Sequence, residues 1–251
     1  MSTKQERLIV LGRLSSVLAH EIRNPLAGIS AATQMLDGKM DRGDPRKKYV
    51  GMILKEVDRV NDIVKNLLDF SREGRAYMVP VRVGDLVESA LGRFAGPLEK
   101  AGIRVVTECG DDVPRAVCDT EHMGRVFQNL IANSIDAMEA GGTLTVRVWH
   151  DAAAGQVAVS VEDTGAGVEV ENMGDLFSPF YTTKAKGNGL GLPVALKFVE
   201  EHGGTITARR LEPHGLAMTV RWPVEAPSET AAPAAAPPAA AADDAGSTGP
   251  R

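Results

Sequence analysis

The 251-residue sequence predicts an α+β protein: a helical hairpin followed by an α/β sandwich domain with a mixed sheet. Apolar residues repeated in steps of three and four predict the hairpin, and short apolar runs alternating with amphipathic segments predict the sandwich. From about Val224 onward the chain consists mainly of Ala, Pro, Ser, Asp and Gly and has no large apolar side chain, which predicts disorder. We therefore expect domains at 1–73 and 85–223, a linker at 74–84 and a disordered tail at 224–251.

The charge balance and the cysteine content exclude several classes of function. The chain has 28 Lys and Arg against 33 Asp and Glu, a net charge of −5, and lacks the basic surplus that nucleic acid binding needs. Cys109 and Cys118 lack metal-site spacing, and we expect both to be buried in a reducing compartment. No apolar run approaches the roughly 18 residues of a membrane span. We expect a cytoplasmic protein.

Two helices are predicted in the first unit. A first run of seam residues implies a helix of about ten turns, and a second run follows the turn-forming stretch DGKMDRGDP. A single hairpin exposes one apolar seam, and a second copy would cover it, which predicts a homodimer with a four-helix bundle. The seam residues are Leu11, Leu14, Leu18, Ile22, Pro25, Ile29, Ala32 and Leu36 in the first helix, and Val50, Ile53, Val57, Val60, Val64 and Leu67 in the second.

The second unit mixes helices and strands. Several strands follow each other through short turns, so the helices cannot all be crossovers between parallel strands, and we expect a mixed sheet covered by helices on one face. The helices are predicted at 85–100, 120–139 and 190–202, and the strands at 103–108, 143–148, 157–161, 204–209 and 217–222.

A histidine occupies the outer face of the first predicted helix. His20 lies two residues from both Leu18 and Ile22, about 200° of rotation in each direction, so its imidazole points away from the core. A solvated surface histidine is the alternative. The nearby Pro25 costs a helix hydrogen bond and bends the helix, and together with a neighbouring acid and amide it favours a chemical role.

An exposed imidazole can act as a nucleophile through one nitrogen when an acceptor holds its other N–H. Glu21 is the candidate acceptor, and Asn24, one turn further on, can orient a water that hydrolyses a phosphorylated ring. The segment LAHEIRNPLAGI resembles the phospho-acceptor motif of sensor histidine kinases. This resemblance implies that His20 is phosphorylated, that Glu21 is its base and that Asn24 serves a phosphatase activity.

Two motifs of the second unit have nucleotide-binding chemistry. QNLIANSIDAM places Asn129 and Asn133 one helical turn apart, where two side-chain oxygens can help to hold Mg²⁺; plain surface positions are the alternative. VEDTGAGV follows an apolar strand, and its Asp163 offers an anionic acceptor to an exocyclic amine. Gly165 and Gly167 would let a planar ring approach the backbone closely, although a plain hairpin loop is the alternative.

A third, irregular segment at 178–188 is expected to form a mobile lid over a polyanion, with Thr182, Thr183 and Lys184 at the terminal phosphates. The glycine-rich start of the next helix offers free N–H groups and the positive end of the helix dipole to phosphate. Neither a P-loop pattern nor a Rossmann fingerprint is present. The residues expected at this helix start are Gly187, Gly189, Leu190 and Gly191.

In this order, NLIAN, DTGAG, FSPFYTTK and GNGLGL resemble the N, G1, F and G2 boxes of the Bergerat ATP-binding domain of histidine kinases. With the phospho-acceptor motif, the resemblance covers about 8–222. It implies Mg-ATP binding, with Asp163 reading adenine, Asn129 and Asn133 at the metal and phosphates, and a lid over the γ-phosphate. The family often has a basic residue where this chain has Asp136.

We therefore expect Mg-ATP to phosphorylate His20, in cis or in trans within the dimer, followed by transfer to an aspartate in the receiver domain of a response regulator on a separate chain. One alternative is an ATP-hydrolysing enzyme of the same fold, as in gyrase. It is disfavoured because Asn129 stands where those enzymes have a glutamate, and an amide is a poor base. The other is a non-catalytic dimeric scaffold, disfavoured because His20, Asn133 and Asp163 are all present.

Overall fold

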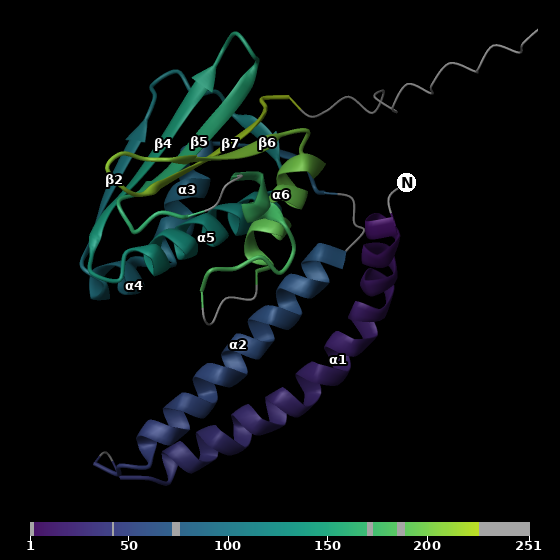
Figure 1. Ribbon diagram of the computed structural model, residues 1–251, viewed down its shortest axis with the longest axis vertical. Helices are drawn as coiled ribbons and strands as arrows, with labels where there is room; N and C mark the ends of the chain where they lie inside the picture. Colours follow the sequence, from purple (N-terminus) through teal and green to yellow (C-terminus); the bar gives the residue numbers. More distant parts are fainter. Residues whose placement is uncertain (1–2, 42, 72–75, 170–172, 185–188, 226–251) are drawn as a thin grey trace, which may run out of the picture.

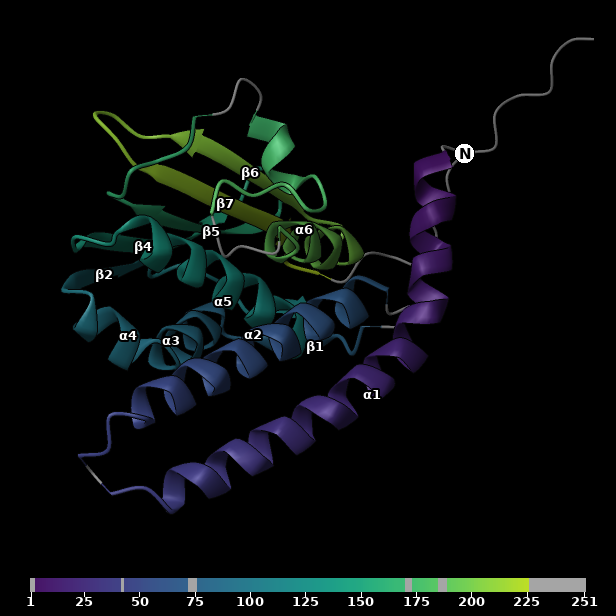
Figure 2. The same ribbon diagram turned by 60° about the horizontal axis from the view of Figure 1, so that its bottom comes forward.

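Two long helices form the hairpin in a computed structural model that describes residues 3–41, 43–71, 76–169, 173–184 and 189–225. Helix α1 (Thr3–Gly38) has 36 residues, the ten turns that its repeat predicts, and α2 (Lys47–Ser71) has 25. Figures 1 and 2 both show α1 curving along its length, and Pro25 lies inside it. The predicted hairpin is confirmed.

The hairpin has a buried face and an uncovered apolar face. Val50, Val57 and Val64, at heptad intervals on α2, are buried. The predicted seam of α1, by contrast, lies open to solvent from Ile22 onward, with Ile29 47% exposed and more than half of Leu36 exposed. The exposed large apolar side chains of the hairpin are Ile22, Ile29, Met35, Leu36, Tyr49, Met52 and Ile53.

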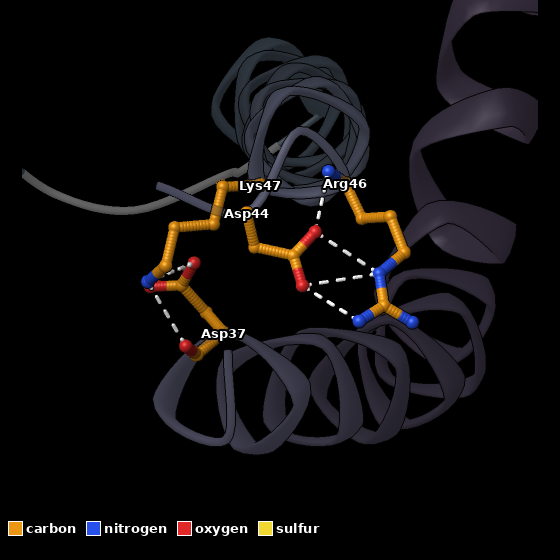
Figure 3. A network of polar contacts seen from close by, with 4 residues as sticks. All are labelled: Asp37, Asp44, Arg46 and Lys47. Atoms are coloured by element: carbon orange, nitrogen blue, oxygen red, sulfur yellow. Dashed lines mark hydrogen bonds and ion pairs between the residues drawn. The ribbon is translucent and has the colours of Figure 1, made fainter. Parts of the chain in front are cut away.

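Ion pairs close the turn between the two helices (Figure 3). Lys47 Nζ donates to the backbone oxygen of Asp37 at 3.0 Å and to its carboxylate at 3.2 Å, which ties the end of α1 to the start of α2. Asp44 accepts from the Arg46 backbone N–H at 2.8 Å and from its guanidinium at 2.6 Å. These bonds lower the pKa of Asp44 to about 2. Because such surface pairs add little stability, their main effect is to set the geometry of the turn.

The second unit is built on a five-stranded sheet in the order β2-β4-β5-β7-β6. β2 pairs in parallel with β4, and the other pairs are antiparallel, which confirms the predicted mixed sheet. Asp163, at the end of central strand β5, lies opposite Leu144 and Leu216. The strands are β2 (Ile103–Cys109), β4 (Gly142–Asp151), β5 (Gln156–Asp163), β6 (Thr205–Arg210) and β7 (Leu216–Pro223).

Helices cover one face of this sheet, as expected. Figure 1 shows α5 (Thr120–Ala137) and α6 (Gly191–Glu201) between the sheet and the hairpin, with α3 (Val83–Gly92) beside them. A single core fills the space between helices and strands. Its largest fully buried apolar side chains are Trp222, Phe127, Met123, Leu130, Ile131, Met138 and Leu144.

The helix expected at 85–100 is wrong, because the structure divides it into α3 and a short α4 (Ala95–Lys100). Pro97 lacks an N–H and its ring clashes with the carbonyl four residues earlier, which kinks or breaks a helix; here, unlike at Pro25 in α1, the helix breaks. The backbone turns at Phe94, with φ −106° and ψ 9°.

Three short elements were not expected from the sequence. β1 (Val79–Val81), inside the expected linker, pairs antiparallel with β3 (Ala116–Cys118), and a 3₁₀ helix spans Met173–Phe177. Segments of three to five residues carry too little periodicity to be recognised.

Two details at the edges of the fold also differ from expectation. Cys118 is buried, which raises the pKa of its thiol to about 12, but Cys109 is exposed at the end of edge strand β2. Val224, where the tail was expected to begin, makes backbone hydrogen bonds to Val117 and Gly155. The rest of the expected tail, from residue 226, lies outside the described residues.

Across the described helices, length and apolar character nowhere reach what a membrane crossing requires.

Candidate functional site

Helix α5 carries one wall of the site, and a buried polar cluster holds its start. The Asp119 carboxylate caps the helix by accepting from the backbone N–H groups of Glu121 and His122, at 2.9 and 3.1 Å, and from that of Tyr77 at 2.7 Å. Burial raises the pKa of Asp119, but these three donors outweigh it and leave the pKa lowered. The other end of α5 contacts the loop after β5, where the Ala166 N–H donates to the Ala137 carbonyl oxygen at 3.1 Å.

His202 supports this cap from α6. Its Nε2 accepts from the Asp119 backbone N–H at 2.9 Å, and its Nδ1 lies 2.6 Å from the Phe198 carbonyl oxygen. The neutral ring protonated on Nδ1 satisfies both bonds. Burial lowers the pKa of His202, which favours this neutral form.

One cavity of about 1100 Å³ opens between α5, the end of β5, the start of α6 and α2. Most of the residues expected from the sequence to bind nucleotide line it. They are Asn129, Asn133, Asp163, Gly165, Gly167, Thr182, Thr183, Lys184, Gly189 and Gly191.

Asp163 lies buried at the base of this cavity, 3% exposed. Its Oδ1 accepts from the Gly165 N–H at 3.0 Å and its Oδ2 accepts from Ser134 Oγ at 3.1 Å. Burial raises its pKa, and the hydrogen bonds from Gly165, Ser134 and the backbone N–H of Leu216, together with the charge of Lys184, oppose that rise. A carboxylate has about four acceptor sites, so acceptor capacity is left for a ligand amine.

The glycines near Asp163 serve close backbone packing as well as access. A Cβ on Gly165 would lie 2.5 Å from the Ala137 carbonyl oxygen, and Gly167 has φ +71°. Any larger residue at 165 would push the loop off the end of α5. These glycines were expected to let a ligand ring approach the backbone, but Gly165 also lets the loop pack against the end of α5.

Asn129 and Asn133 lie one turn apart on α5, as expected, and have different partners. Asn129 Nδ2 donates to the Gly191 carbonyl oxygen at 3.0 Å, which links α5 to the start of α6. Asn133 Oδ1 accepts from Lys184 Nζ at 3.0 Å. Oxygen donors suit Mg²⁺, and the ammonium beside Asn133 shows that this point attracts a cation, so the residues fit the ion.

The segment after Phe180 meets the start of α6. The Phe180 N–H donates to the Gly189 carbonyl oxygen at 2.9 Å, and Thr182 Oγ1 accepts from the Lys184 N–H at 3.1 Å. Gly189 has φ +63°, and a Cβ there would lie 2.4 Å from the Phe180 carbonyl carbon. The last four residues of the expected lid, 185–188, which include Gly187, lie outside the described residues.

Helix α6 begins at Gly191. Leu190 takes the N-cap position, and its side chain has no oxygen that could cap the first turn. Leu190 is 3% exposed and is not among the residues that line the cavity, so its expected role through the backbone N–H stays a prediction. Pro193 lies in the first turn, where a missing N–H costs least.

Helix α2 of the hairpin forms part of the cavity wall. Arg59, Asp62 and Asn66 line the same cavity as Asn133 and Asp163. Arg125 of α5 is partly desolvated, which lowers its pKa, and the charge of Asp62 opposes that shift. The hairpin and the sandwich therefore share this cavity.

The three residues of the expected acceptor motif lie on α1. Glu21 and Asn24 are exposed and do not line the cavity. His20 belongs to the helix, but its side chain lies outside the described part of the structure.

Sequence reasoning missed Ser134, Asp136 and the α2 residues of the cavity. Ser134 directly follows Asn133 in the NSID segment, but nothing in its type shows that its hydroxyl holds Asp163. The α2 residues look like an ordinary solvated face, because no local pattern reveals which other element packs there.

This architecture is that of a Bergerat-type ATP-binding domain joined to a phospho-acceptor hairpin, and comparison with known proteins agrees. Residues 10–75 match the His Kinase A (phospho-acceptor) domain, and residues 118–226 match the Histidine kinase-, DNA gyrase B-, and HSP90-like ATPase family. The chain belongs to the sensor histidine kinases, with one phospho-acceptor domain and one ATP-binding domain.

Among curated relatives, the signal transduction histidine-protein kinase AtoS of Escherichia coli K12 is 32% identical over 220 residues. This alignment covers 87% of the present chain and 36% of AtoS. The sensor histidine kinase ZraS of Escherichia coli K12 is 32% identical over 221 residues, which cover 88% of the chain and 47% of ZraS. The chain thus spans less than half the length of these relatives.

Solved structures show the same fold. Histidine kinase ThkA, in its complex with the response regulator protein TrrA, aligns with a TM-score of 0.65 at 29% identity, covering 88% of this chain and 64% of that one. Full-length ShkA aligns with a TM-score of 0.72 at 21% identity, covering 86% of this chain and 46% of ShkA. The latter likeness concerns the fold alone.

Proposed function

We propose that this chain is an ATP-dependent protein histidine kinase that phosphorylates His20 and passes the phosphoryl group to an aspartate of a response regulator on a separate chain. One observation carries the proposal. The cavity with the buried Asp163 carboxylate and the Asn129–Asn133 pair is also lined by α2, the partner helix of the one that bears the acceptor motif.

In this proposal different residues of the cavity bind the adenine, the phosphates and the metal ion. Asp163 accepts a hydrogen bond from the adenine amino group, and Ser134 keeps the carboxylate oriented. The N-terminal N–H groups of α6 and Lys184 bind the phosphates. Asn129 and Asn133 would hold Mg²⁺, which neutralises phosphate charge when bound.

The reaction is a transfer between two nucleophiles. A nitrogen of His20 attacks the γ-phosphorus of ATP, an N–P bond forms, and the bond from the γ-phosphorus to the β,γ-bridging oxygen breaks, so that ADP leaves. Glu21 accepts the other imidazole N–H and stabilises the positive charge that develops on the ring. Positioning supplies most of the rate, which agrees with a site that has few bases.

Two partners complete the proposal. The receiver aspartate of a response regulator takes the phosphoryl group from phosphohistidine, as the complex of ThkA with its response regulator supports. A second copy of this chain covers the uncovered apolar face of the hairpin, from Ile22 to Ile53, and gives a four-helix bundle. Asn24 would orient water when phosphohistidine or the regulator is dephosphorylated.

The test is incubation with labelled Mg-ATP, followed by acid and base treatment of the labelled protein. A phosphoramidate survives base and is lost in acid, so base-stable, acid-labile label is expected, and His20→Gln should remove it. His150→Gln, a histidine on β4 outside the cavity, is the matched control and should keep the label. Acid-stable label, or label retained in His20→Gln, would refute the assignment.

A further inference from the structure

A lysine ammonium occupies the phosphate end of the cavity. Lys184 Nζ lies 2.8 Å from Asp136 Oδ2 and 3.0 Å from Asn133 Oδ1. Asp136 lies on α5, so this ion pair joins the helix to the segment after Phe180 that carries Lys184.

The side chain of Lys184 points into the cavity. Asn133 and Asp136 lie three residues apart on one face of α5, and both line the cavity together with Lys184. The positive charge of Lys184 also reaches Asp163, because it opposes the rise of the pKa of that carboxyl. The ammonium therefore projects into the cavity and contacts Asn133 and Asp136 there.

The ion pair between Lys184 and Asp136 is exposed to solvent, so the ammonium can change its other contacts. The side chain of Lys184 is 36% exposed and that of Asp136 is 60% exposed. Ion pairs with this exposure contribute about 0–1 kcal/mol, because solvent screens them. A triphosphate can therefore draw the ammonium off Asn133 at little cost, and a metal cation at Asn133 would repel it from there.

Without a cation beside it, Asp136 would disfavour nucleotide binding. Its carboxylate would repel the phosphates, since two like charges a few ångströms apart repel by about 1 kcal/mol even in bulk water. The acid is compatible with ATP binding only when a cation stands between it and the phosphates, and Lys184 is the cation that the structure places there.

We propose that Asp136 is a positioning residue that holds Lys184 at the phosphate end of the cavity, so that the ammonium leaves Asn133 and binds the γ-phosphate while its contact with Asp136 persists. This inference rests on the proposed function, since it assumes that Mg-ATP binds in this cavity. It assigns a role in selecting ATP over ADP, because only the triphosphate offers a γ-phosphate to Lys184.

A double-mutant cycle on nucleotide binding tests it. The dissociation constants of the ATP analogue AMPPNP and of ADP, both with Mg²⁺, are measured by calorimetry for the wild type, Asp136→Asn, Lys184→Met and the double variant. We expect Asp136→Asn to weaken AMPPNP binding about 3- to 10-fold and to change ADP binding less than 2-fold. In the Lys184→Met background the same substitution should no longer weaken AMPPNP binding and should instead tighten it slightly, because it then only removes the repulsion between the Asp136 carboxylate and the phosphates.

Three outcomes would overturn the proposal. The first is an equal loss of AMPPNP and ADP affinity in Asp136→Asn. The second is an unchanged or tighter AMPPNP affinity when Asp136→Asn is made in the wild type. The third is a weakening by Asp136→Asn that persists in the Lys184→Met background. Glu139→Gln, an acid that also lines the cavity but is not paired with Lys184 in the structure, is the matched control and should show no coupling to Lys184. The binding readout does not depend on phosphotransfer, so failure of His20 labelling would be seen separately.

Discussion

Replacing Asp163 with asparagine should selectively remove recognition of adenine. The substitution keeps the shape of the side chain and removes its charge. A hydrogen bond to a charged group contributes about 1.5–3 kcal/mol, which corresponds to a loss of about 10- to 150-fold in affinity for ADP. Ser134, the Gly165 N–H and the Leu216 N–H already use part of the acceptor capacity of the carboxylate, and the adenine amine would use what remains.

The assay is calorimetric binding of Mg-ADP and Mg-IDP, because inosine lacks the exocyclic amine. The wild type should prefer ADP, and Asp163→Asn should lose most of that preference. Asp85→Asn is the matched control: its carboxylate is exposed on α3, 3.9 Å from Arg82, and lies outside the cavity wall. If Asp163→Asn bound ADP as tightly as the wild type, or preferred ADP to IDP to the same degree, the adenine assignment would be refuted.

Three further outcomes are expected. Because burial lowers the pKa of His202, the unfolded chain binds more protons below pH 6.5, so the unfolding free energy should fall as pH drops through this value in urea titrations. His202→Phe should cost about 1–3 kcal/mol and flatten this dependence; an unchanged slope would contradict it. Gly189→Ala should lose about 1–2 kcal/mol and bind Mg-ATP more weakly, whereas Gly96→Ala, with open space around it, should do neither. Ile29→Glu should shift the protein from dimer to monomer in sedimentation, and Val105→Glu on edge strand β2 should not; a dimer that survives Ile29→Glu would exclude this face as the interface.

The sequence was sufficient for the long elements and for most of the expected residues that line the cavity. The two hairpin helices have heptad repeats, β5 is a nearly continuous apolar run and β4 alternates apolar and polar residues, so these elements could be recognised locally. Asn129, Asn133 and Asp163 could be found because their motifs combine unusual residue types at fixed spacing. The break at Pro97 was visible in the sequence but was outweighed by the apolar pattern around it.

Only the tertiary structure shows the contacts between residues that are far apart in the sequence. The pairing of β1 with β3, the hydroxyl of Ser134 on Asp163 and the ammonium of Lys184 on Asp136 join residues 29 to 48 positions apart or short segments without periodicity. The contribution of α2 to the cavity is of the same kind. Chain spacing determines which side chains share a helix face, whereas contacts between elements depend on how the whole core packs. That packing brings Asp136 of α5 into contact with Lys184 of the segment after Phe180.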